Sequence, residues 1–204
     1  MGNIIYDDSK YTVISGQSTR SVTVTTPDTG NRVIVGTVSG IAPDSFVINS
    51  FQLGGVNPDF VIENGIDASA DYRVRLGIWV NPSVGNHTLT VVFNKAASSY
   101  SHCIACYSLS GVNQSSPYIH LDTGSITYTD VPNGAVAIGH LVAASAPSLG
   151  ADQIILYSST YCKAWYTNPC TDGDLTATMS SSKNVRQVAA LMRPASFAGG
   201  VMFL

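Results

Sequence analysis

The sequence predicts an all-β fold, a two-sheet antiparallel sandwich that is jelly-roll-like and has about ten strands. Three observations predict it. Several short segments alternate between apolar and polar side chains, which is the period of a half-buried strand. Turn residues separate these segments at intervals of about 8–15 residues. No stretch carries the periodicity of an amphipathic helix over about three turns.

The alternation is clearest in the segments 72–80 and 87–93. Between them, NPSVGN supplies the Pro, Gly and Asn that tight turns favour, so the sequence predicts a hairpin with 81–86 as its exposed connection. The side chains expected to point from these two segments into the core are Leu76, Ile78, Leu89 and Val91.

Further strands are expected where β-branched and aromatic residues gather between turn signals. The segment 32–38 is apolar on both faces, which is typical of a central strand covered on both sides. The other candidate strands are 21–26, 46–53, 100–109, 125–129, 135–143, 152–159, 162–167, 175–180 and 185–192.

One domain is expected, because no internal repeat or linker interrupts the chain. Residues 1–20 are interpreted as an N-terminal arm or edge strand, 21–196 as the β-sandwich domain and 197–204 as an apolar C-terminal tail. The tail either folds back on the domain's own core or contacts a neighbouring subunit. Its apolar side chains, which form the predicted partner contact in the second case, are Phe197, Val201, Met202, Phe203 and Leu204.

The composition excludes several classes of protein. Of 204 residues, 45% are hydrophobic and only 11% are charged, so the chain is not of the disordered type. The net charge is −3 and the basic residues are scattered, so we expect no nucleic-acid partner. No apolar run has the length of a membrane helix, and the N-terminus lacks the pattern of a secretory signal. We therefore expect synthesis in a cytoplasm and no membrane association.

The four cysteines are expected to be structural thiols. Cys103 and Cys106 have the spacing of a zinc-binding pair, but they lie in one predicted strand. Residues three apart in a strand point to opposite faces, so the two thiols are not expected to share an ion or a disulfide. Cys162 and Cys170 either remain free or close a small loop in an oxidising medium.

The sequence contains no motif that predicts catalysis. The nucleophile elbow, the zinc-protease helix and the Gly-rich phosphate loop are all missing. Asp59 and Glu63 flank an aromatic residue but are expected to be structural acids, and the histidines to be structural or surface residues. We therefore predict no enzyme activity, no catalytic residue, no cofactor and no metal.

An aromatic cluster admits two interpretations. Tyr161, Trp165 and Tyr166 lie close together in the sequence. Such residues fill a core or an interface, or, where they are exposed in a loop, they stack on sugar rings. The second interpretation makes these three residues a candidate glycan contact.

Motifs along residues 20–196 resemble one family. In order they are NRVIVGTVSG, FQLGG, RLGIWVNPSVGNHTLTVVF, CYSLSGVNQSSP and VAALMRPAS. The chain resembles a jelly-roll-like β-sandwich domain of phage structural proteins, such as decoration and tail proteins, and of bacterial surface proteins. The motifs are turn and core signatures, so the resemblance implies a fold and carries over no catalytic residue.

The resemblance implies a non-enzymatic phage virion protein, made in the host cytoplasm. We expect a capsid decoration (cement) protein that contacts a major capsid or other virion protein and forms a homo-oligomer. Low charge and an apolar tail fit an assembly subunit. The alternative is a carbohydrate-binding or receptor-binding module of a tail or surface protein.

Overall fold

The structure, a computed structural model, describes residues 2–14, 17–41, 47–65, 72–94, 102–123, 126–143, 148–150, 152–159, 161–171, 173, 175–177, 179–180 and 186–195. These residues form seventeen β-strands and no helix. The strands are β1 (Ile5–Ile14), β2 (Thr19–Thr26), β3 (Val33–Ile41), β4 (Ile48–Leu53), β5 (Phe60–Asn64), β6 (Tyr72–Val80), β7 (Gly85–Phe93), β8 (His102–Ser110), β9 (Tyr118–Asp122), β10 (Ile126–Tyr128), β11 (Val136–Val142), β12 (Ser148–Leu149), β13 (Gln153–Ser158), β14 (Cys162–Thr167), β15 (Leu175–Ala177), β16 (Met179–Ser180) and β17 (Arg186–Met192).

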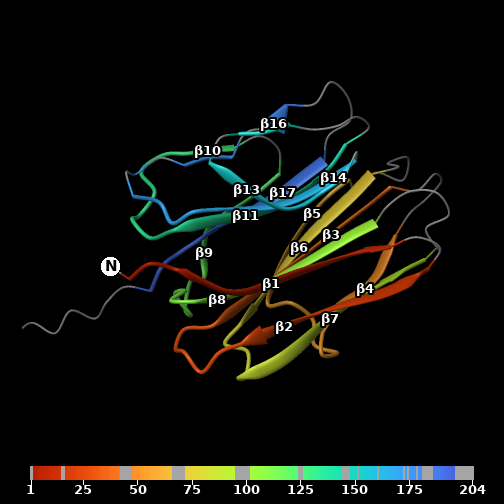
Figure 1. Cartoon of the computed structure of the whole chain (residues 1–204), viewed down its shortest axis with the longest axis horizontal. Coiled ribbons are helices and arrows are strands. Elements are labelled where there is room, and N and C mark those ends of the chain that lie inside the picture. Colours follow the sequence, from red (N-terminus) through yellow and green to blue (C-terminus); the bar gives the residue numbers. More distant parts are fainter. Residues whose placement is uncertain are drawn as a thin grey trace, which may run out of the picture.

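The first eight strands have jelly-roll topology. Antiparallel pairs nest along the chain, β1 with β8, β2 with β7 and β3 with β6, as if one long hairpin had been rolled up. The central sheet has the order β1-β8-β3-β6-β5, and the lower sheet has the order β2-β7-β4. Figure 1 shows the lower sheet beneath the central one. The tip of the rolled hairpin is the turn at Gly54 and Gly55, which joins β4 to β5 and has positive φ at both glycines.

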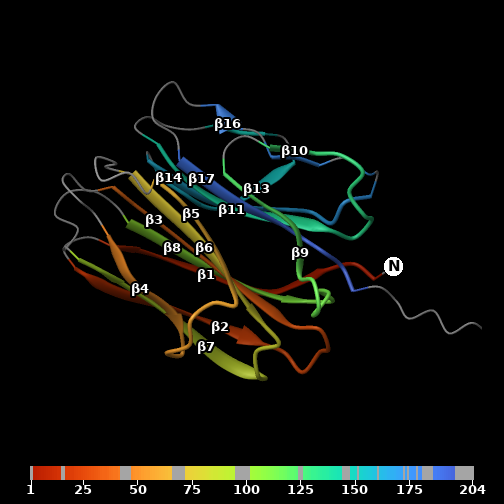
Figure 2. The same ribbon diagram turned by 180° about the vertical axis from the view of Figure 1, so that it is seen from behind.

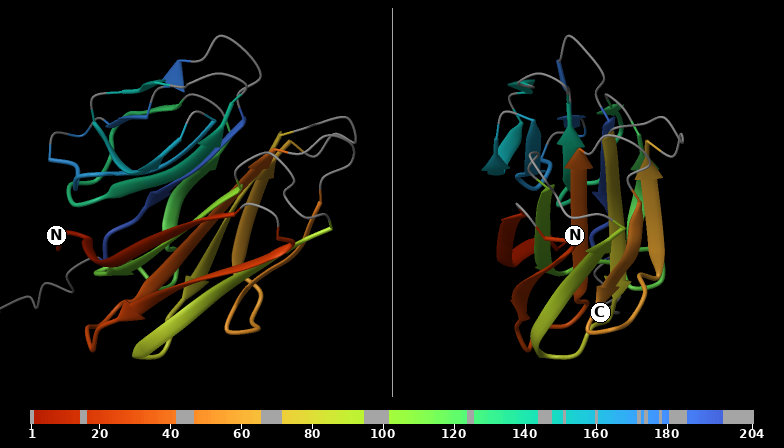
Figure 3. Two further views of the ribbon diagram at one scale, coloured as in Figure 1. Left: turned by 45° about the vertical axis from the view of Figure 1, so that its right-hand side comes forward. Right: turned by 90° about the vertical axis from the view of Figure 1, so that its right-hand side faces the viewer.

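The remaining strands build a second large sheet on the other face of the central sheet. This upper sheet has the order β13-β14-β11-β17-β9. Its strands contact those of the central sheet in matching order, β13 with β1, β14 with β8, β11 with β3 and β17 with β6. At the far edge, the Phe60 ring of β5 packs edge-on against Tyr118 of β9. The layers are also visible from behind (Figure 2) and after a 45° turn (Figure 3, left). The predicted all-β antiparallel sandwich is confirmed.

Each strand's burial follows from its place in this stack. β8 and β11 are buried at every residue, because layers cover both of their faces. β3 is central, as its doubly apolar sequence predicted. β2 instead alternates between exposed and buried residues, because it lies in the outermost layer. On the outer face, the hydroxyls of Thr23 in β2 and Thr88 in β7 are hydrogen-bonded at 2.9 Å.

Two short ladders, β10 with β15 and β12 with β16, lie beyond the upper sheet. A third apolar cluster contains side chains of this outer layer, including Tyr128 and Leu175, together with Trp165, Ala137 and Leu191 of the upper sheet. The fold therefore adds layers on both sides of the ten-strand sandwich that the central and upper sheets form.

The predicted hairpin of 72–80 with 87–93 is wrong. β6 pairs with β3 and β5 in the central sheet, whereas β7 pairs with β2 and β4 in the lower sheet. In a jelly roll the pairs are nested, so the connection 81–84 crosses between sheets instead of closing a hairpin. The alternation itself was assigned to the correct faces. Leu76 and Ile78 face the upper sheet, and Leu89 and Val91 pack between the central and lower sheets.

The N-terminal segment 5–14 is an edge strand of the central sheet, where β1 pairs with β8. Sequence inspection did not identify β5, β9 and β12 as strands. These strands are short, and β5 and β9 carry partly buried side chains without a clean alternation.

Truncating either of two core leucines should cost about 2–5 kcal/mol of unfolding free energy. Leu76 and Leu89 are fully buried in separate interlayer cores, so Leu76→Ala and Leu89→Ala each leave a cavity. Urea denaturation measures the loss. Val84→Ala is the control, because Val84 is 50% exposed in a connection. A cost below about 0.5 kcal/mol for either leucine would contradict its place in the core.

Candidate functional site

A groove of about 380 Å³ lies beside the tip where β4 and β5 part into different sheets. Its volume falls in the range of about 300–1,000 Å³ typical of small-molecule pockets. β4 lines one side, the turn between β4 and β5 contributes two residues, and β5 and β6 line the other side. The lining residues are Asn49, Ser50, Phe51, Gln52, Asn57, Pro58, Val61, Glu63 and Arg75.

The groove exists because the two jelly-roll sheets differ in width. The central sheet has five strands and the lower sheet three, so β5 extends past the edge strand β4. Phe60 and Ile62 of β5 pack toward the upper sheet, so the alternate residues Val61 and Glu63 face the other way. Val61 is 55% exposed there, as an uncovered position on this face requires.

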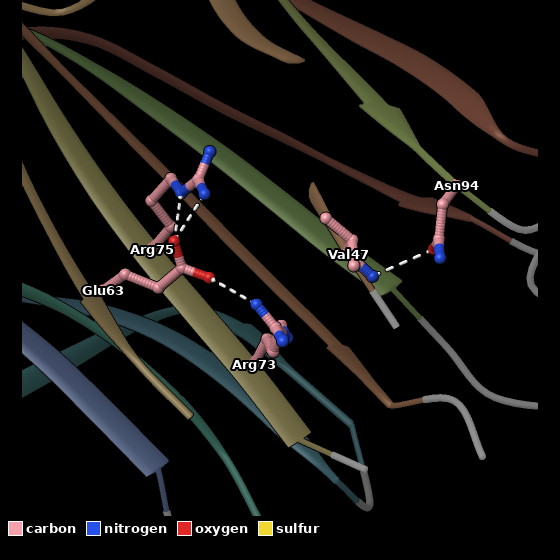
Figure 4. Close-up of polar contacts among 5 residues, drawn as sticks. All are labelled: Val47, Glu63, Arg73, Arg75 and Asn94. Carbon is pink, nitrogen blue, oxygen red and sulfur yellow. Dashed lines mark hydrogen bonds and ion pairs between the residues drawn. The ribbon is translucent and has the colours of Figure 1, made fainter. Parts of the chain in front are cut away.

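The charged end of the groove is an ion-paired triad (Figure 4). Glu63 lies directly opposite Arg75 in the β5–β6 ladder. Arg75 donates from Nε to Glu63 Oε2 at 2.8 Å and makes a second, shorter contact from Nη2 to the same oxygen. Arg73 Nη1 donates to Glu63 Oε1 at 3.2 Å. All three side chains are largely buried, so the pairing fixes the orientation of both guanidinium groups.

The apolar part of the groove depends on Gly77. A Cβ added at Gly77 would lie 2.6 Å from the Phe51 ring and 2.9 Å from Pro58. Because Gly77 has no side chain, Phe51 and Pro58 pack directly against the backbone of β6. Phe51 packs in turn against Trp79, with ring centroids 5.4 Å apart.

The polar wall of the groove, formed by β4 and the turn that follows it, is held in place by hydrogen bonds at both ends of β4. Before β4, Val47 N donates to Asn94 Oδ1 at 2.9 Å (Figure 4). In return, Asn94 N donates to Val47 O at 3.0 Å. After β4, Gln52 Nε2 donates to Asn57 Oδ1 at 3.1 Å across the turn. These contacts fix the wall between the end of β7 and the Gly-Gly turn.

The acids singled out in the sequence have structural partners. Glu63 belongs to the triad, and Asp59 Oδ2 accepts a hydrogen bond from the Val80 backbone N–H at 2.7 Å. The two carboxylates therefore support neighbouring strands. This geometry matches their interpretation as structural acids.

The three aromatic residues proposed as a glycan contact do not form one surface. Trp165 is fully buried in the outer apolar cluster, so stacking on a sugar is ruled out for it. Tyr166, next in the strand, points to the opposite face and packs on Tyr6, with ring centroids 4.5 Å apart. Tyr161 is partly buried against the core between the central and upper sheets. The alternation of a strand separates neighbours that look adjacent in sequence.

The cysteines of each pair considered in the sequence lie on opposite faces of their sheets. Cys103 faces the core beneath the upper sheet, whereas Cys106 faces the lower sheet, which confirms their predicted opposition. Cys162 and Cys170 also lie in different apolar clusters, on opposite sides of the upper sheet. The disulfide considered for that pair is not formed, and all four cysteine side chains are buried.

The thiols should be unreactive in the folded protein. Burial raises the pKa of the Cys103 and Cys106 thiols, and it raises that of Cys162 to about 11. The reactive thiolate of these three residues is therefore scarce at neutral pH, and the fourth cysteine, Cys170, is also buried. We expect a colorimetric thiol reagent to label almost none of the four cysteines in native protein and all of them in denaturant. Rapid labelling without denaturant would contradict this burial.

One histidine forms a buried polar cluster between two layers. His140 of β11 contacts two residues of β3: its Nε2 lies 2.8 Å from Ser39 Oγ and its Nδ1 lies 2.7 Å from Thr37 Oγ1. Burial lowers the pKa of His140 to about 3. His140 is fully buried, so its side chain lies in the interior of the fold.

The apolar tail lies outside the described residues, with Phe197, Val201, Met202, Phe203 and Leu204 among its members. The part of the chain that is described contains no group of three or more metal-ligating side chains. It also contains no helix that could cross a membrane.

Comparison with known proteins found no relative. No family model, no curated protein and no solved structure matches the chain. The resemblance to phage and bacterial-surface β-sandwich domains therefore rests on the sequence motifs alone.

Sequence inspection missed the groove, because its residues come from three strands, β4, β5 and β6, and a turn, which come together only in the folded jelly roll. One local signal was present. Glu63, Arg73 and Arg75 are charged residues within two mainly apolar strand segments, and such charges need partners.

Proposed function

We propose that this chain is a non-enzymatic virion structural protein of a bacteriophage. It acts as a capsid decoration (cement) protein through protein–protein contacts, is made in the host cytoplasm and assembles as a homo-oligomer. The jelly roll occurs in viral capsid and lectin domains alike, so the fold agrees with this proposal without selecting it.

The observation that carries the proposal is a set of exposed apolar side chains on two adjacent edge strands, β1 of the central sheet and β13 of the upper sheet. Ile5 and Tyr11 of β1 are 58% and 48% exposed, and Ile155 of β13 is 49% exposed. β1 and β13 are edge strands of stacked sheets, and the rings of Tyr11 and Tyr157 lie 4.8 Å apart between them. Exposed apolar side chains on adjacent edges support a contact with another subunit.

The low charge of the chain favours the same function. With 11% charged residues, neighbouring copies repel each other weakly. The edge also carries the charged residues Asp8 and Lys10, which form an ion pair of 3.1 Å. Charges on an edge limit indiscriminate strand pairing, so the apolar side chains can serve one specific partner.

Purified phage particles test the proposal. Mass spectrometry should find the chain in a fixed ratio to the major capsid protein, and analytical ultracentrifugation should find an oligomer of the free protein. Tyr11→Asp and Ile155→Asp should lower both particle occupancy and oligomer content. Val84→Asp, at an exposed site in the connection between β6 and β7, should change neither. Absence of the chain from particles would overturn the proposal.

A further inference from the structure

We infer that the groove between β4 and β5 binds a neutral, polyhydroxylated ligand, namely a sugar residue of a glycan. This inference is independent of the proposed virion role, because it concerns other residues and a different flank of the jelly roll. It also differs from the aromatic glycan contact, in which Trp165 is buried.

The polar groups of the groove come as neighbouring donors and acceptors. Gln52 Nε2 donates to Asn57 Oδ1, which leaves the Gln52 carbonyl oxygen as an acceptor and the Asn57 amide as a donor. Glu63 accepts one hydrogen bond from Arg73 and two from Arg75. A carboxylate has about four acceptor positions, so Glu63 keeps acceptor capacity beside the guanidinium donors of Arg75.

This alternation matches hydroxyl groups better than it matches an anion. A hydroxyl donates one hydrogen bond and accepts others, so vicinal hydroxyls of a sugar are satisfied by adjacent donor–acceptor pairs. An anion only accepts, and it would meet the Glu63 carboxylate, which lines the groove with Arg75. Of the triad's two guanidinium groups, only that of Arg75 lines the groove, and it is paired there with Glu63. A neutral ligand with hydroxyl groups can use both the carboxylate and the guanidinium, whereas an anionic ligand can use only the guanidinium.

The apolar lining completes the match. Phe51, Pro58 and Val61 line the same groove as the amides and the ion pair. A pyranose ring has C–H faces as well as hydroxyl edges, so it needs apolar and polar contacts together. The triad and the Gln52–Asn57 hydrogen bond hold the polar groups in place before binding, which reduces the ordering cost.

Glycan binding is tested on an array of neutral and sialylated oligosaccharides, followed by calorimetry with the neutral oligosaccharide that gives the strongest signal. Asn49→Ala and Asn57→Ala remove exposed amides of the groove, so the fold should tolerate them. Each should weaken binding about threefold to tenfold. Val61→Trp fills the groove and should abolish binding. Glu63→Gln tests the acceptor directly, with its folding checked by circular dichroism.

Asn86→Ala is the matched control, because Asn86 is an exposed amide of β7 that does not line the groove. Binding that this control weakens as much as Asn57→Ala does would overturn the inference. The same follows if no neutral glycan binds, if only sialylated glycans bind, or if Val61→Trp leaves the affinity unchanged. An affinity for extended peptides that Val61→Trp abolishes, without any for glycans, would assign the groove to another ligand and also overturn it.

Discussion

Replacing Trp165 with alanine is expected to lower the free energy of unfolding by about 3–5 kcal/mol. Trp165 is the largest fully buried side chain, and it fills the space between the upper sheet and the outer ladders. Its removal leaves a cavity that surrounding strands, fixed by their ladders, cannot close. Urea denaturation monitored by far-ultraviolet circular dichroism measures the loss.

Gly139 makes the same prediction testable from the opposite direction. It lies opposite Trp165 in the β11–β14 ladder, and a Cβ at this position would overlap the indole ring. Gly139→Ala should therefore destabilise the protein by about 1–3 kcal/mol through overpacking. In the Trp165→Ala background the added methyl group enters vacated space, so the two costs should not add. Simple additivity would show that the two side chains do not compete for the same space.

An exposed Trp165 would give a different outcome. If Trp165 were a surface platform for sugars, its removal would change stability by less than about 0.5 kcal/mol. The stability measurement therefore tests the burial of Trp165, which excludes the sugar-stacking interpretation of this residue.

Much of the fold follows from local patterns. The alternation of 72–80 identified both faces of β6, and the doubly apolar β3 lies where a buried strand is expected. The pairing of β6 was mispredicted because a short polar connection looks the same whether it closes a hairpin or crosses between sheets. Nested pairing is a long-range property, and no local signal distinguishes the two.

The groove and the polar cluster were missed for a related reason. Thr37 and Ser39 continue a row of apolar residues on β3, and His140 interrupts a similar row on β11. Each looks like an isolated polar residue in a core strand. They satisfy one another only because β11 stacks on β3, which the sequence does not specify.

Acid should destabilise this protein partly through His140. Its pKa is lowered to about 3 by burial, against 6.5 for the free side chain, so the folded state holds it neutral while the unfolded state takes up a proton. The stabilising contribution is fully present above pH 6.5 and is lost as the pH falls from 6.5 toward 3. At about 1.4 kcal/mol per pH unit, the loss between pH 6.5 and 4.5 is about 3 kcal/mol.

His140→Gln isolates this contribution. Glutamine keeps one donor and one acceptor for Thr37 and Ser39 but does not titrate. The variant should be less stable than the wild type at pH 7.5, yet its stability should fall about 3 kcal/mol less by pH 4.5. His102, whose pKa burial lowers to about 4, adds a second contribution that His102→Gln removes in the same way. His120→Gln is the control, because His120 is exposed. If the stabilities of wild type and His140→Gln decline in parallel between pH 7.5 and 4.5, the imidazole of His140 is not held neutral by the stack of sheets.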